Sequence, residues 1–353
     1  MSRTMTTNKN ISEFRSDTFT MPDEAMRKVI YEAEVGNSGY GEDPSVNQLE
    51  ETIATYFGSD EAIFLPSATM AGQIAIAVWA RPGDMVLLEK YGHSYYFETG
   101  AMSAIAGAQA HLLDAERGIL NPDDIAERIV HPENPYARTA LIVLENTSNF
   151  GGGTIYPQAT LDTIFSLATD EKLPVHVDGA RIWNALAANS ESDPKKLIHS
   201  DGSMSVCFSK GLGAPMGAAL IGSANFIQEA RRVQLMLGGA MRQVGFMAAA
   251  ALYSFQNNRK RLTEDHDNAL FLAKSLQDIE GIEIDLEGVQ TNMVYIDVIE
   301  GVAKASSLVL QLDAAGIRTL NVGSRIRFVA SMLVNRSDCE RAVEVFTALT
   351  HSN

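Results

Sequence analysis

Short apolar runs with strand character alternate with amphipathic helical segments along most of this chain of 353 residues. Residues 62–80 predict a short strand, a turn and then a helix. Further strands are predicted at 85–89, 139–147, 173–180 and 205–211, and further helices at 45–57, 121–130 and 160–173. Strands that alternate with helices usually pair in parallel, because each helix carries the chain back across the sheet. The pattern therefore predicts an α/β fold with a mostly parallel central sheet flanked by helices.

Two helix starts carry a capping-box pattern, in which a hydroxyl residue is followed three residues later by Glu or Gln. Ser45 and Gln48 form this pattern at the start of the helix at 45–57. Ser337 and Glu340 repeat it for a helix at 337–350. We expect these residues to cap their helices.

The chain changes character after about residue 255, where a strongly charged helical segment follows small apolar residues. Two further strands are predicted beyond it, at 292–298 and 325–331. We therefore expect three parts: a loose N-terminal arm, a large domain with the parallel sheet, and a smaller C-terminal α+β domain. Their boundaries are predicted at 1–13, 14–255 and 256–353.

The composition limits the classes of function. The formal net charge is −16 and the sequence pI is about 4.9, which argues against nucleic-acid and anionic-membrane partners because both need basic patches. Two cysteines provide no disulfide framework, and the N-terminus lacks the apolar core of a signal peptide. A cytoplasmic protein that acts on small molecules is expected.

Polar residues collect at the predicted carboxyl ends of the strands. They are Glu145, Asn146, Asp178, Arg181 and Lys210. In open α/β sheets, ligands bind at this edge. The clustering therefore raises the expectation that each of these residues takes part in one site.

Lys210 stands between an apolar strand and a glycine-rich segment. Desolvation lowers the pKa of a lysine, and a neutral amine can form a Schiff base with an aldehyde. The alternative is a lysine that extends from the strand end to solvent. The glycines do not indicate a phosphate loop, because the Gly-Lys-Ser/Thr order is absent and a strand, rather than a helix, is predicted next.

Asp178 follows a buried strand 32 residues before Lys210, which leaves room for one crossover. Its carboxylate can keep a pyridine nitrogen protonated, or it can form a salt bridge with Arg181. His176 shares a strand face with Asp178, but two ligands without a third do not predict a metal site.

Three residues, Ser67, Ala68 and Thr69, open the helix after the first strand. Free backbone N–H groups and hydroxyls there suit a phosphate, although a plain helix cap uses the same residue types. His93 lies among aromatic residues. It can stack on a flat cofactor ring, act as a base near neutral pH, or simply pack in the core.

Arginines are candidates for binding anions. Arg181 and Arg327 can hold a carboxylate through paired hydrogen bonds, with Ser16 adding a hydroxyl, whereas salt bridges and a turn are the structural alternatives. Arg242 follows two glycines and can reach a phosphate or pair with an acidic group.

Taken together, these parts suit a pyridoxal-phosphate site for amino acids, and their order resembles the L-threonine aldolase family of fold-type I enzymes. The resemblance extends from about residue 14 to 335. It is carried by the stretches FRSDTFTMP, AEVGNSGYGEDPSVNQLEE, FLPSATMAGQ, LENTSN, HVDGARIWNA, SVCFSKGLGAPMG and LGGAMRQ.

The resemblance implies a role for each candidate. Lys210 would form the imine with pyridoxal 5'-phosphate, Asp178 would bind its pyridine nitrogen and His93 would stack on its ring. Ser67–Thr69 and Arg242 would bind the phosphate, with Arg242 commonly coming from a neighbouring subunit. The substrate carboxylate would be bound by Ser16, Arg181 and Arg327.

The implied reaction is retro-aldol cleavage of a β-hydroxy-α-amino acid to glycine and an aldehyde by a homodimer or homotetramer. Three positions depart from the family pattern: Pro135 and Ser148 stand where histidines are usual, and Ala68 where glycine is usual. Loss of two histidines near the β-substituent favours a larger or more apolar aldehyde, as from phenylserine. It also leaves racemization or β-elimination on the same scaffold as the alternative.

Overall fold

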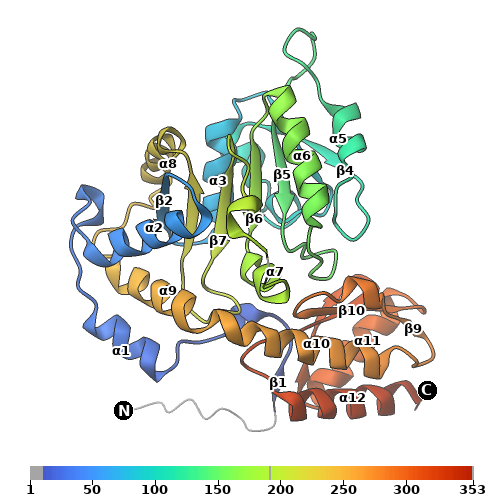
Figure 1. The fold of residues 1–353 in the computed structure, drawn as a ribbon. Helices are drawn as coiled ribbons and strands as arrows, with labels where there is room; N and C mark the ends of the chain where they lie inside the picture. Colours follow the sequence, from blue (N-terminus) through green and yellow to red (C-terminus); the bar gives the residue numbers. More distant parts are fainter. Residues whose placement is uncertain (1–10, 191, 352–353) are drawn as a thin grey trace. The chain divides into compact units, whose positions relative to one another are not determined.

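A computed structural model describes residues 11–190 and 192–351 (Figure 1). Residues 21–260 form one compact unit, called the large unit below. The described residues up to Thr20 and from Arg261 onward form a second one, the small unit.

These limits differ from the predicted boundaries, and pairing across the sequence is the reason. Strand β1 (Ser12–Glu13) pairs in parallel with β11 (Ile317–Arg318), and the next residue, Phe14, is fully buried in the small unit. The described segment at 11–20 therefore belongs with the C-terminal part of the chain. Residues 1–10 of the expected arm lie outside the described residues.

Among the described residues of the large unit, seven strands form one sheet in the order β2-β8-β7-β6-β5-β3-β4. All neighbours are parallel except those of β8, which runs antiparallel to both β7 and β2. The predicted mostly parallel sheet is confirmed. The strands are β2 (Glu61–Leu65), β3 (Met85–Glu89), β4 (Gln109–Leu113), β5 (Thr139–Glu145), β6 (Val175–Gly179), β7 (Ser203–Cys207) and β8 (Ala218–Gly222).

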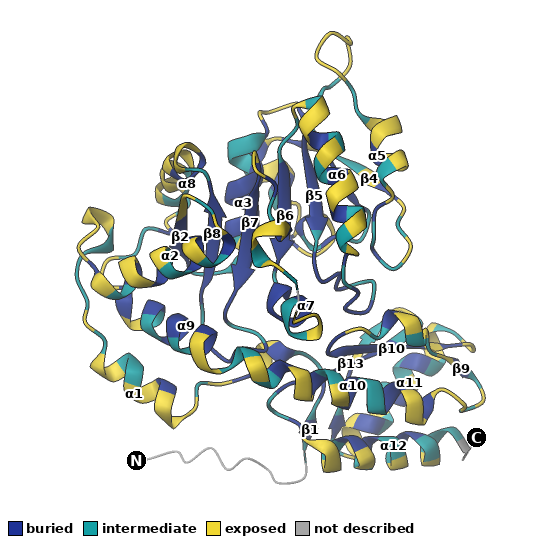
Figure 2. Ribbon diagram, in the orientation of Figure 1, coloured by how far each residue is buried: buried dark blue, intermediate teal, exposed yellow. Residues whose placement is uncertain are grey.

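Helices cover this sheet, whose strands are mostly buried apart from the edge strand β4, while the helices expose their outer sides (Figure 2). Apolar residues of α3 and α8 pack on β2 and β8 in one cluster, and α3 also packs on β3 and β5 in a second. The helices of the large unit are α1 (Glu24–Glu32), α2 (Pro44–Phe57), α3 (Ala68–Trp79), α4 (His93–Tyr96), α5 (Pro122–Arg128), α6 (Gln158–Glu171), α7 (Ile182–Ala188), α8 (Ala224–Met236) and α9 (Gly245–Asn257).

The start of α2 corrects the predicted cap. Asp43, rather than Ser45, precedes the helix and accepts a hydrogen bond from the N–H of Val46 at 3.2 Å. Its other oxygen accepts the N–H of Gly245, the first residue of α9, at 2.9 Å. Asp43 is fully buried, and a Cβ on Gly245 would lie 2.2 Å from its carboxylate. The GEDP stretch is thus a junction that joins two helix starts.

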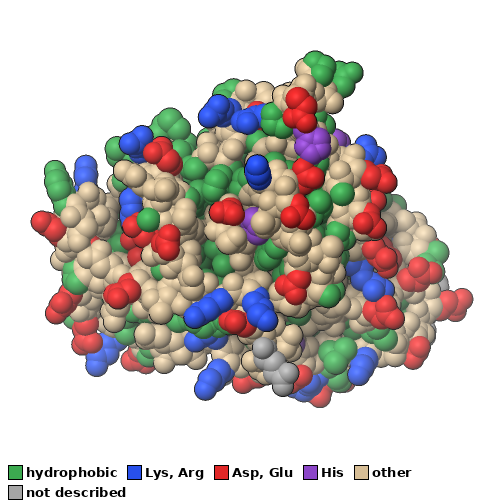
Figure 3. All heavy atoms as spheres, turned by 45° about the horizontal axis from the view of Figure 1, so that its top comes forward, with side chains coloured by type: hydrophobic (Ala, Val, Ile, Leu, Met, Phe, Trp, Pro, Cys, Tyr) green, Lys and Arg blue, Asp and Glu red, His purple; other side chains and the backbone are tan. Residues whose placement is uncertain are grey.

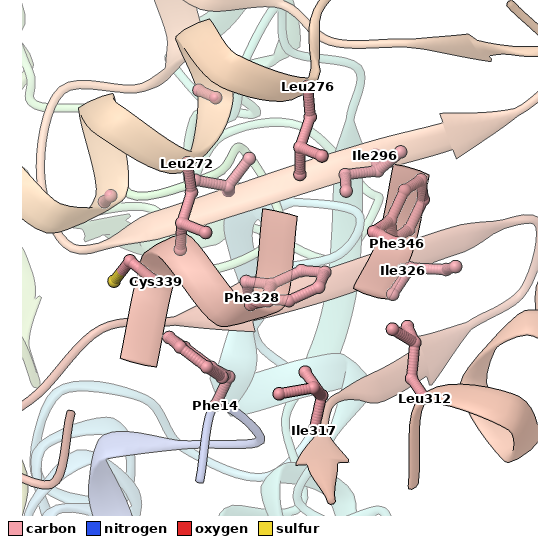
Figure 4. Packing of buried hydrophobic residues seen from close by; sticks show 14 of the residues in the cluster. Phe14, Leu272, Leu276, Ile296, Leu312, Ile317, Ile326, Phe328, Cys339 and Phe346 are labelled. Carbon is pink, nitrogen blue, oxygen red and sulfur yellow. The ribbon is translucent and has the colours of Figure 1, made fainter. Parts of the chain in front are cut away.

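The small unit is an α+β structure, as predicted. Among its described residues, strands in the order β12-β13-β10-β9 form an antiparallel sheet, and three helices accompany it. The elements are β9 (Ile282–Glu283), β10 (Met293–Val298), β12 (Leu320–Val322), β13 (Arg325–Val329), α10 (Leu262–Leu276), α11 (Val302–Ala314) and α12 (Arg336–His351). Aromatic and aliphatic side chains from these elements and from β1's end converge in one core, with Phe14 beside Phe328 (Figure 4).

The start of α12 also differs from its predicted cap. The N–H of Asn335 donates to the Asp338 carboxylate at 3.0 Å, and the N–H of Asp338 donates to the side-chain oxygen of Asn335 at 3.1 Å. The reciprocal pair therefore begins two residues earlier than Ser337 and uses different residue types.

No helix within 11–190 or 192–351 has the length and apolarity needed to cross a membrane. Lysine and arginine side chains are scattered among aspartates and glutamates on the face shown in Figure 3.

Candidate active site

One edge of the large sheet collects most of the predicted site. Because β8 is antiparallel to both β7 and β2, strand β2 runs in the same direction as the parallel strands. The carboxyl ends of β2, β3, β5, β6 and β7 therefore meet at one edge. Ser67, His93, Asp178 and Lys210 each lie on or directly beyond one of these ends.

Strand alternation places the polar side chains on the face that α3 covers. His176 bonds through Nδ1 to the Ser203 hydroxyl at 2.9 Å, and that hydroxyl accepts the indole N–H of Trp79 from α3 at 2.9 Å. Asp178 lies two residues after His176 and thus on the same face. Glu145 follows Leu141 and Val143, which pack against α3, in the same alternation.

Asp178 is buried at the end of β6, where Ala180 N–H donates to its Oδ1 at 3.0 Å. In the sheet, Asp178 is paired with Glu145 on the neighbouring strand β5 and with Ser205 on the neighbouring strand β7. Arg181 follows Asp178 by three residues, lies directly before α7 and is also buried. The structure therefore brings the predicted carboxylate into a buried row of polar side chains.

Lys210 is partly buried in a tight loop between β7 and β8. The loop is closed by hydrogen bonds from Phe208 N–H to the Gly217 carbonyl at 3.0 Å and from Gly213 N–H to the Lys210 carbonyl at 2.9 Å. Gly217 has φ 115°, and a Cβ there would lie 2.7 Å from the Phe64 ring. The glycines shape this loop, and a strand follows it, as the sequence indicated.

The Ser67–Thr69 turn opens α3. Ser67 precedes the helix and its hydroxyl accepts the Met70 N–H at 3.2 Å, while Thr69 is exposed. The hydroxyl thus performs the ordinary capping role. The remaining N–H groups of the first turn also point out at this edge, where an anion is favoured.

His93 is the first residue of α4, and its side chain is 36% exposed, so it is not a packed core histidine. Its backbone N–H donates to Glu145 at 2.7 Å, and its Nδ1 lies 2.8 Å from Glu98. The Phe97 ring stacks on it at a centroid distance of 5.5 Å. Burial opposes protonation of the ring, but the hydrogen bond to Glu98 and the charges of Asp178 and Glu145 outweigh it, so the pKa of His93 is raised.

Other groups at this edge also have shifted pKa values. Burial raises the pKa of Glu145, with the Asp178 charge adding to it, and raises that of Glu89 to about 7. Burial lowers the pKa of His176 to about 4, so its ring is neutral at physiological pH. No group of three or more His, Cys, Asp or Glu side chains that could hold a metal is gathered within the described ranges.

Two predicted carboxylate-binding residues lie together in the small unit. Arg327 on β13 is largely buried, and its Nη2 donates to the Arg15 carbonyl at 3.0 Å. The next residue, Ser16, accepts the Thr18 N–H at 3.2 Å. Arg327 is therefore bonded to the residue that precedes Ser16, in the short segment that follows β1.

Arg242 lies in the large unit before α9, with its side chain exposed. Its carbonyl accepts the Ser38 N–H at 3.0 Å. The arginine lines a cavity of about 730 Å³ together with residues of the Ser38–Gly41 segment, α2 and α8.

The structure corrects one expectation about the missing histidines. Pro135 lies on an exposed loop before β5, at the amino end of that strand, whereas Ser148 lies beyond its carboxyl end. A strand of seven residues separates these ends by about 20 Å, so the two positions do not line one site within a chain. Ser148 is buried, and its hydroxyl accepts the Gly151 N–H at 3.1 Å.

Glu98 and Gln73 were not anticipated from the sequence. Glu98 is buried five residues after His93, and Gln73 donates to it from the second turn of α3 at 2.6 Å. A glutamate shortly after a candidate histidine was the only local signal. The glutamine gave none, because its position facing α4 depends on how the helices pack.

The gathered groups fit pyridoxal phosphate by their chemistry. An amine (Lys210), a carboxylate (Asp178), an aromatic imidazole (His93) and a helix start with hydroxyls match its aldehyde, ring nitrogen, ring face and phosphate. The Ser205 hydroxyl beside Asp178 is buried and has no hydrogen-bond partner among the described residues. Such a hydroxyl is suited to a polar group of a bound molecule.

Comparisons with known proteins agree with this chemistry. Residues 13–299 match the profile of the beta-eliminating lyase family. The chain is 37% identical to the low specificity L-threonine aldolase of Escherichia coli O157:H7 over 325 residues, which cover 92% of this chain and 95% of that protein. It is 36% identical to low-specificity L-threonine aldolase 1 of Arabidopsis thaliana, with 95% of each chain covered.

The fold has a close counterpart in a solved structure. The threonine aldolase of Leishmania major superposes with a TM-score of 0.81 at 19% identity, covering 96% of this chain and 99% of that one. On these matches, the chain belongs to the beta-eliminating lyase family and is a pyridoxal-phosphate-dependent lyase of fold type I.

Proposed function

We propose that this protein cleaves L-β-hydroxy-α-amino acids of the threonine, allo-threonine or phenylserine type to glycine and an aldehyde. The observation that carries the proposal is the placement of Asp178 at the end of β6 and of Lys210 beyond the adjacent parallel strand β7, at the edge that also holds Ser67 and His93. The names of the relatives in Escherichia coli and Arabidopsis support cleavage over racemization.

Several residues of the large unit would hold the cofactor. The Lys210 amine would hold its aldehyde group, and the Asp178 carboxylate would keep its ring nitrogen protonated. Ser67, Ala68, Thr69 and Arg242 would bind its phosphate. When bound, the cofactor withdraws electrons from the substrate Cα, which allows the Cα–Cβ bond to break.

Other side chains hold the substrate and move protons. The family resemblance assigns Arg181, Arg327 and Ser16 to the substrate carboxylate, and within the small unit the Arg327 side chain is held by its bond to the Arg15 carbonyl. His93 would lie against the cofactor ring. Because no hydrogen bond among the described residues engages its Nε2, this nitrogen is available for proton exchange with the β-hydroxyl.

The aromatic surroundings support an apolar β-substituent. Phe97 stacks on His93, and Tyr91 stacks on Phe150 at 4.1 Å, with Tyr96 at the edge of both Tyr91 and Phe150. These rings surround the carboxyl ends of β3 and β5. Aryl and small alkyl groups both gain from contact with such a surface, and a β-substituent of either kind suits this site.

The protein is proposed to act in the cytoplasm as a homo-oligomer. Arg242, Tyr40 and Leu235 are exposed around the cavity of about 730 Å³. A basic residue beside exposed apolar side chains suits contact with a second copy, in which Arg242 serves the partner's phosphate site. Light scattering on the purified protein tests this, since a monomer that is fully active would contradict it.

Aldehyde release from L-threonine, L-allo-threonine and L-threo-phenylserine tests the function directly. We expect aldehyde and glycine in equal amounts from at least one substrate. Lys210→Ala should abolish turnover and the visible absorbance of the bound cofactor, and Asp178→Ala should weaken cofactor binding and slow turnover. A cofactor-loaded wild-type protein that releases no aldehyde would overturn the proposal.

A further inference from the structure

His93 is held by the buried side chain of Glu98, which lies beyond the end of α4. Glu98 exposes only 3% of its side chain, and its Oε1 lies 2.8 Å from Nδ1 of His93. Its other oxygen, Oε2, accepts the side-chain N–H of Gln73 at 2.6 Å. Both carboxylate oxygens are therefore used, one by the imidazole and one by an amide.

Gln73 connects this pair to the helix that begins with the Ser67–Thr69 turn. It lies on α3 and is itself buried, with 1% exposed. Besides Glu98, its Nε2 donates to the carbonyl of Ser94, the residue after His93, at 3.3 Å. The amide nitrogen is thus directed at α4 by two acceptors, which fixes which end of the Gln73 amide faces Glu98.

The charges around the imidazole all favour its protonated form. Glu98 follows α4, Glu145 ends β5 and Asp178 lies on β6, and each of these carboxylates contributes to the environment of the ring. Glu145 also holds the His93 backbone N–H at 2.7 Å. The ring therefore has one nitrogen, Nδ1, in a fixed bond to a carboxylate and the other, Nε2, left for exchange.

We propose that Glu98, oriented by Gln73, is a positioning residue that keeps the proton of His93 on Nδ1 and so presents Nε2 as the exchanging nitrogen. A carboxylate can only accept, so the ring nitrogen that faces it must be the donor. In histidines at functional sites, the partner of one ring nitrogen decides the state of the other. The use of Nε2 in catalysis rests on the proposed aldol cleavage. The position of the proton on the His93 ring does not depend on which reaction occurs.

Glu98→Gln gives a sharp test because the side chain keeps its size, while its two equivalent carboxylate oxygens are replaced by one accepting oxygen and one donating NH₂ group. The Gln73 amide needs an acceptor, so the oxygen of the new amide should turn toward Gln73 and its NH₂ toward His93. The ring nitrogen Nδ1 must then accept, and the proton should move to Nε2. Loss of the charge should also lower the pKa of His93 by about one unit, roughly a tenfold loss of proton affinity.

Nitrogen-15 NMR of histidine-labelled, cofactor-loaded enzyme measures both quantities, with His93→Asn identifying its signal among the seven histidines. The double variant Glu98→Gln with Gln73→Met should restore the proton to Nδ1, because the new amide is then free to turn its oxygen to the ring. The matched control is Glu171→Gln, which alters a partly exposed pair with His131 at 3.4 Å and should leave the His93 signal unchanged.

An unchanged proton position and an unchanged pKa of His93 in Glu98→Gln would overturn the proposal. A double variant in which the proton stays on Nε2 would overturn it as well. If Glu98→Gln does not fold, Glu98→Asp serves instead: it keeps the charge, so the proton should remain on Nδ1, and a shift to Nε2 would contradict the role. The pH profile of kcat/KM should move down by the same unit. Should no substrate be cleaved at all, the NMR result still decides the inference separately from the proposed function.

Discussion

Replacing Asp43 with alanine should destabilise the protein without removing its chemistry. Asp43 is fully buried, caps α2 through the Val46 N–H and accepts the Gly245 N–H at the start of α9. Although the GEDP stretch is one of the motifs that identify the family, its carboxylate is committed to two backbone donors. We therefore expect a stability residue.

The expected loss follows from those two bonds. Removing a helix cap costs about 1 kcal/mol, and leaving the buried Gly245 N–H without an acceptor costs about 1–3 kcal/mol more. The free energy of unfolding should fall by about 2–4 kcal/mol in Asp43→Ala. Asp43→Asn keeps one acceptor and places an NH₂ opposite the other donor, so it should lose about half as much.

Urea unfolding at a fixed cofactor concentration measures the change, since bound cofactor itself adds stability. The matched control is Asp23→Ala. Asp23 caps α1 through the Met26 N–H at 2.7 Å but is exposed and has no second helix start to hold, so its loss should be about 1 kcal/mol. A change below 1 kcal/mol in Asp43→Ala, or a tenfold fall in kcat with stability retained, would refute the reasoning.

Three further results are expected. Phe14→Ala should lower the free energy of unfolding of the small unit by about 3–5 kcal/mol because the ring is fully buried against Phe328, and a loss under 1 kcal/mol in thermal or urea unfolding would contradict this packing. Burial raises the pKa of Glu89 from 4.5 to about 7, so its contribution to stability is present below pH 4.5 and is lost as the pH rises toward 7. Urea titrations over this range should show wild type losing up to about 3 kcal/mol and Glu89→Gln losing less, and identical slopes would argue against the shift. Arg327→Lys should raise KM about tenfold or more with a smaller change in kcat, because a paired hydrogen bond to the substrate carboxylate is lost, and steady-state kinetics showing unchanged KM would remove Arg327 from the substrate site.

Much of the large unit was predictable because its signals are local. Alternating strands and helices indicated the parallel sheet, and charged residues directly after apolar strands indicated the edge where Asp178 and Lys210 lie. A strand end and the residue beyond it are neighbours in the sequence, so their proximity needs no knowledge of the fold. Parallel pairing then brings separate strand ends to one edge.

The helix caps show where local signals were insufficient. The sequence favoured Ser45 and Ser337, yet Asp43 and Asn335 cap these helices. A helix start has several polar residues within one turn, each able to accept the free N–H groups. At α2, burial decided between them, since Asp43 also satisfies Gly245, some 200 residues later in the chain.

The remaining features depend on pairs that are distant in sequence. The sequence by itself determined the α/β class, the order of the strand-end residues and the chemistry that they share. Only the tertiary structure decided that the segment at 12–20 joins the C-terminal part through β1 and β11, that Pro135 and Ser148 lie at opposite ends of β5, and that Glu98 and Gln73 hold His93. The physical reason is that residue type and periodicity describe what one segment needs, whereas packing selects which distant segment provides it.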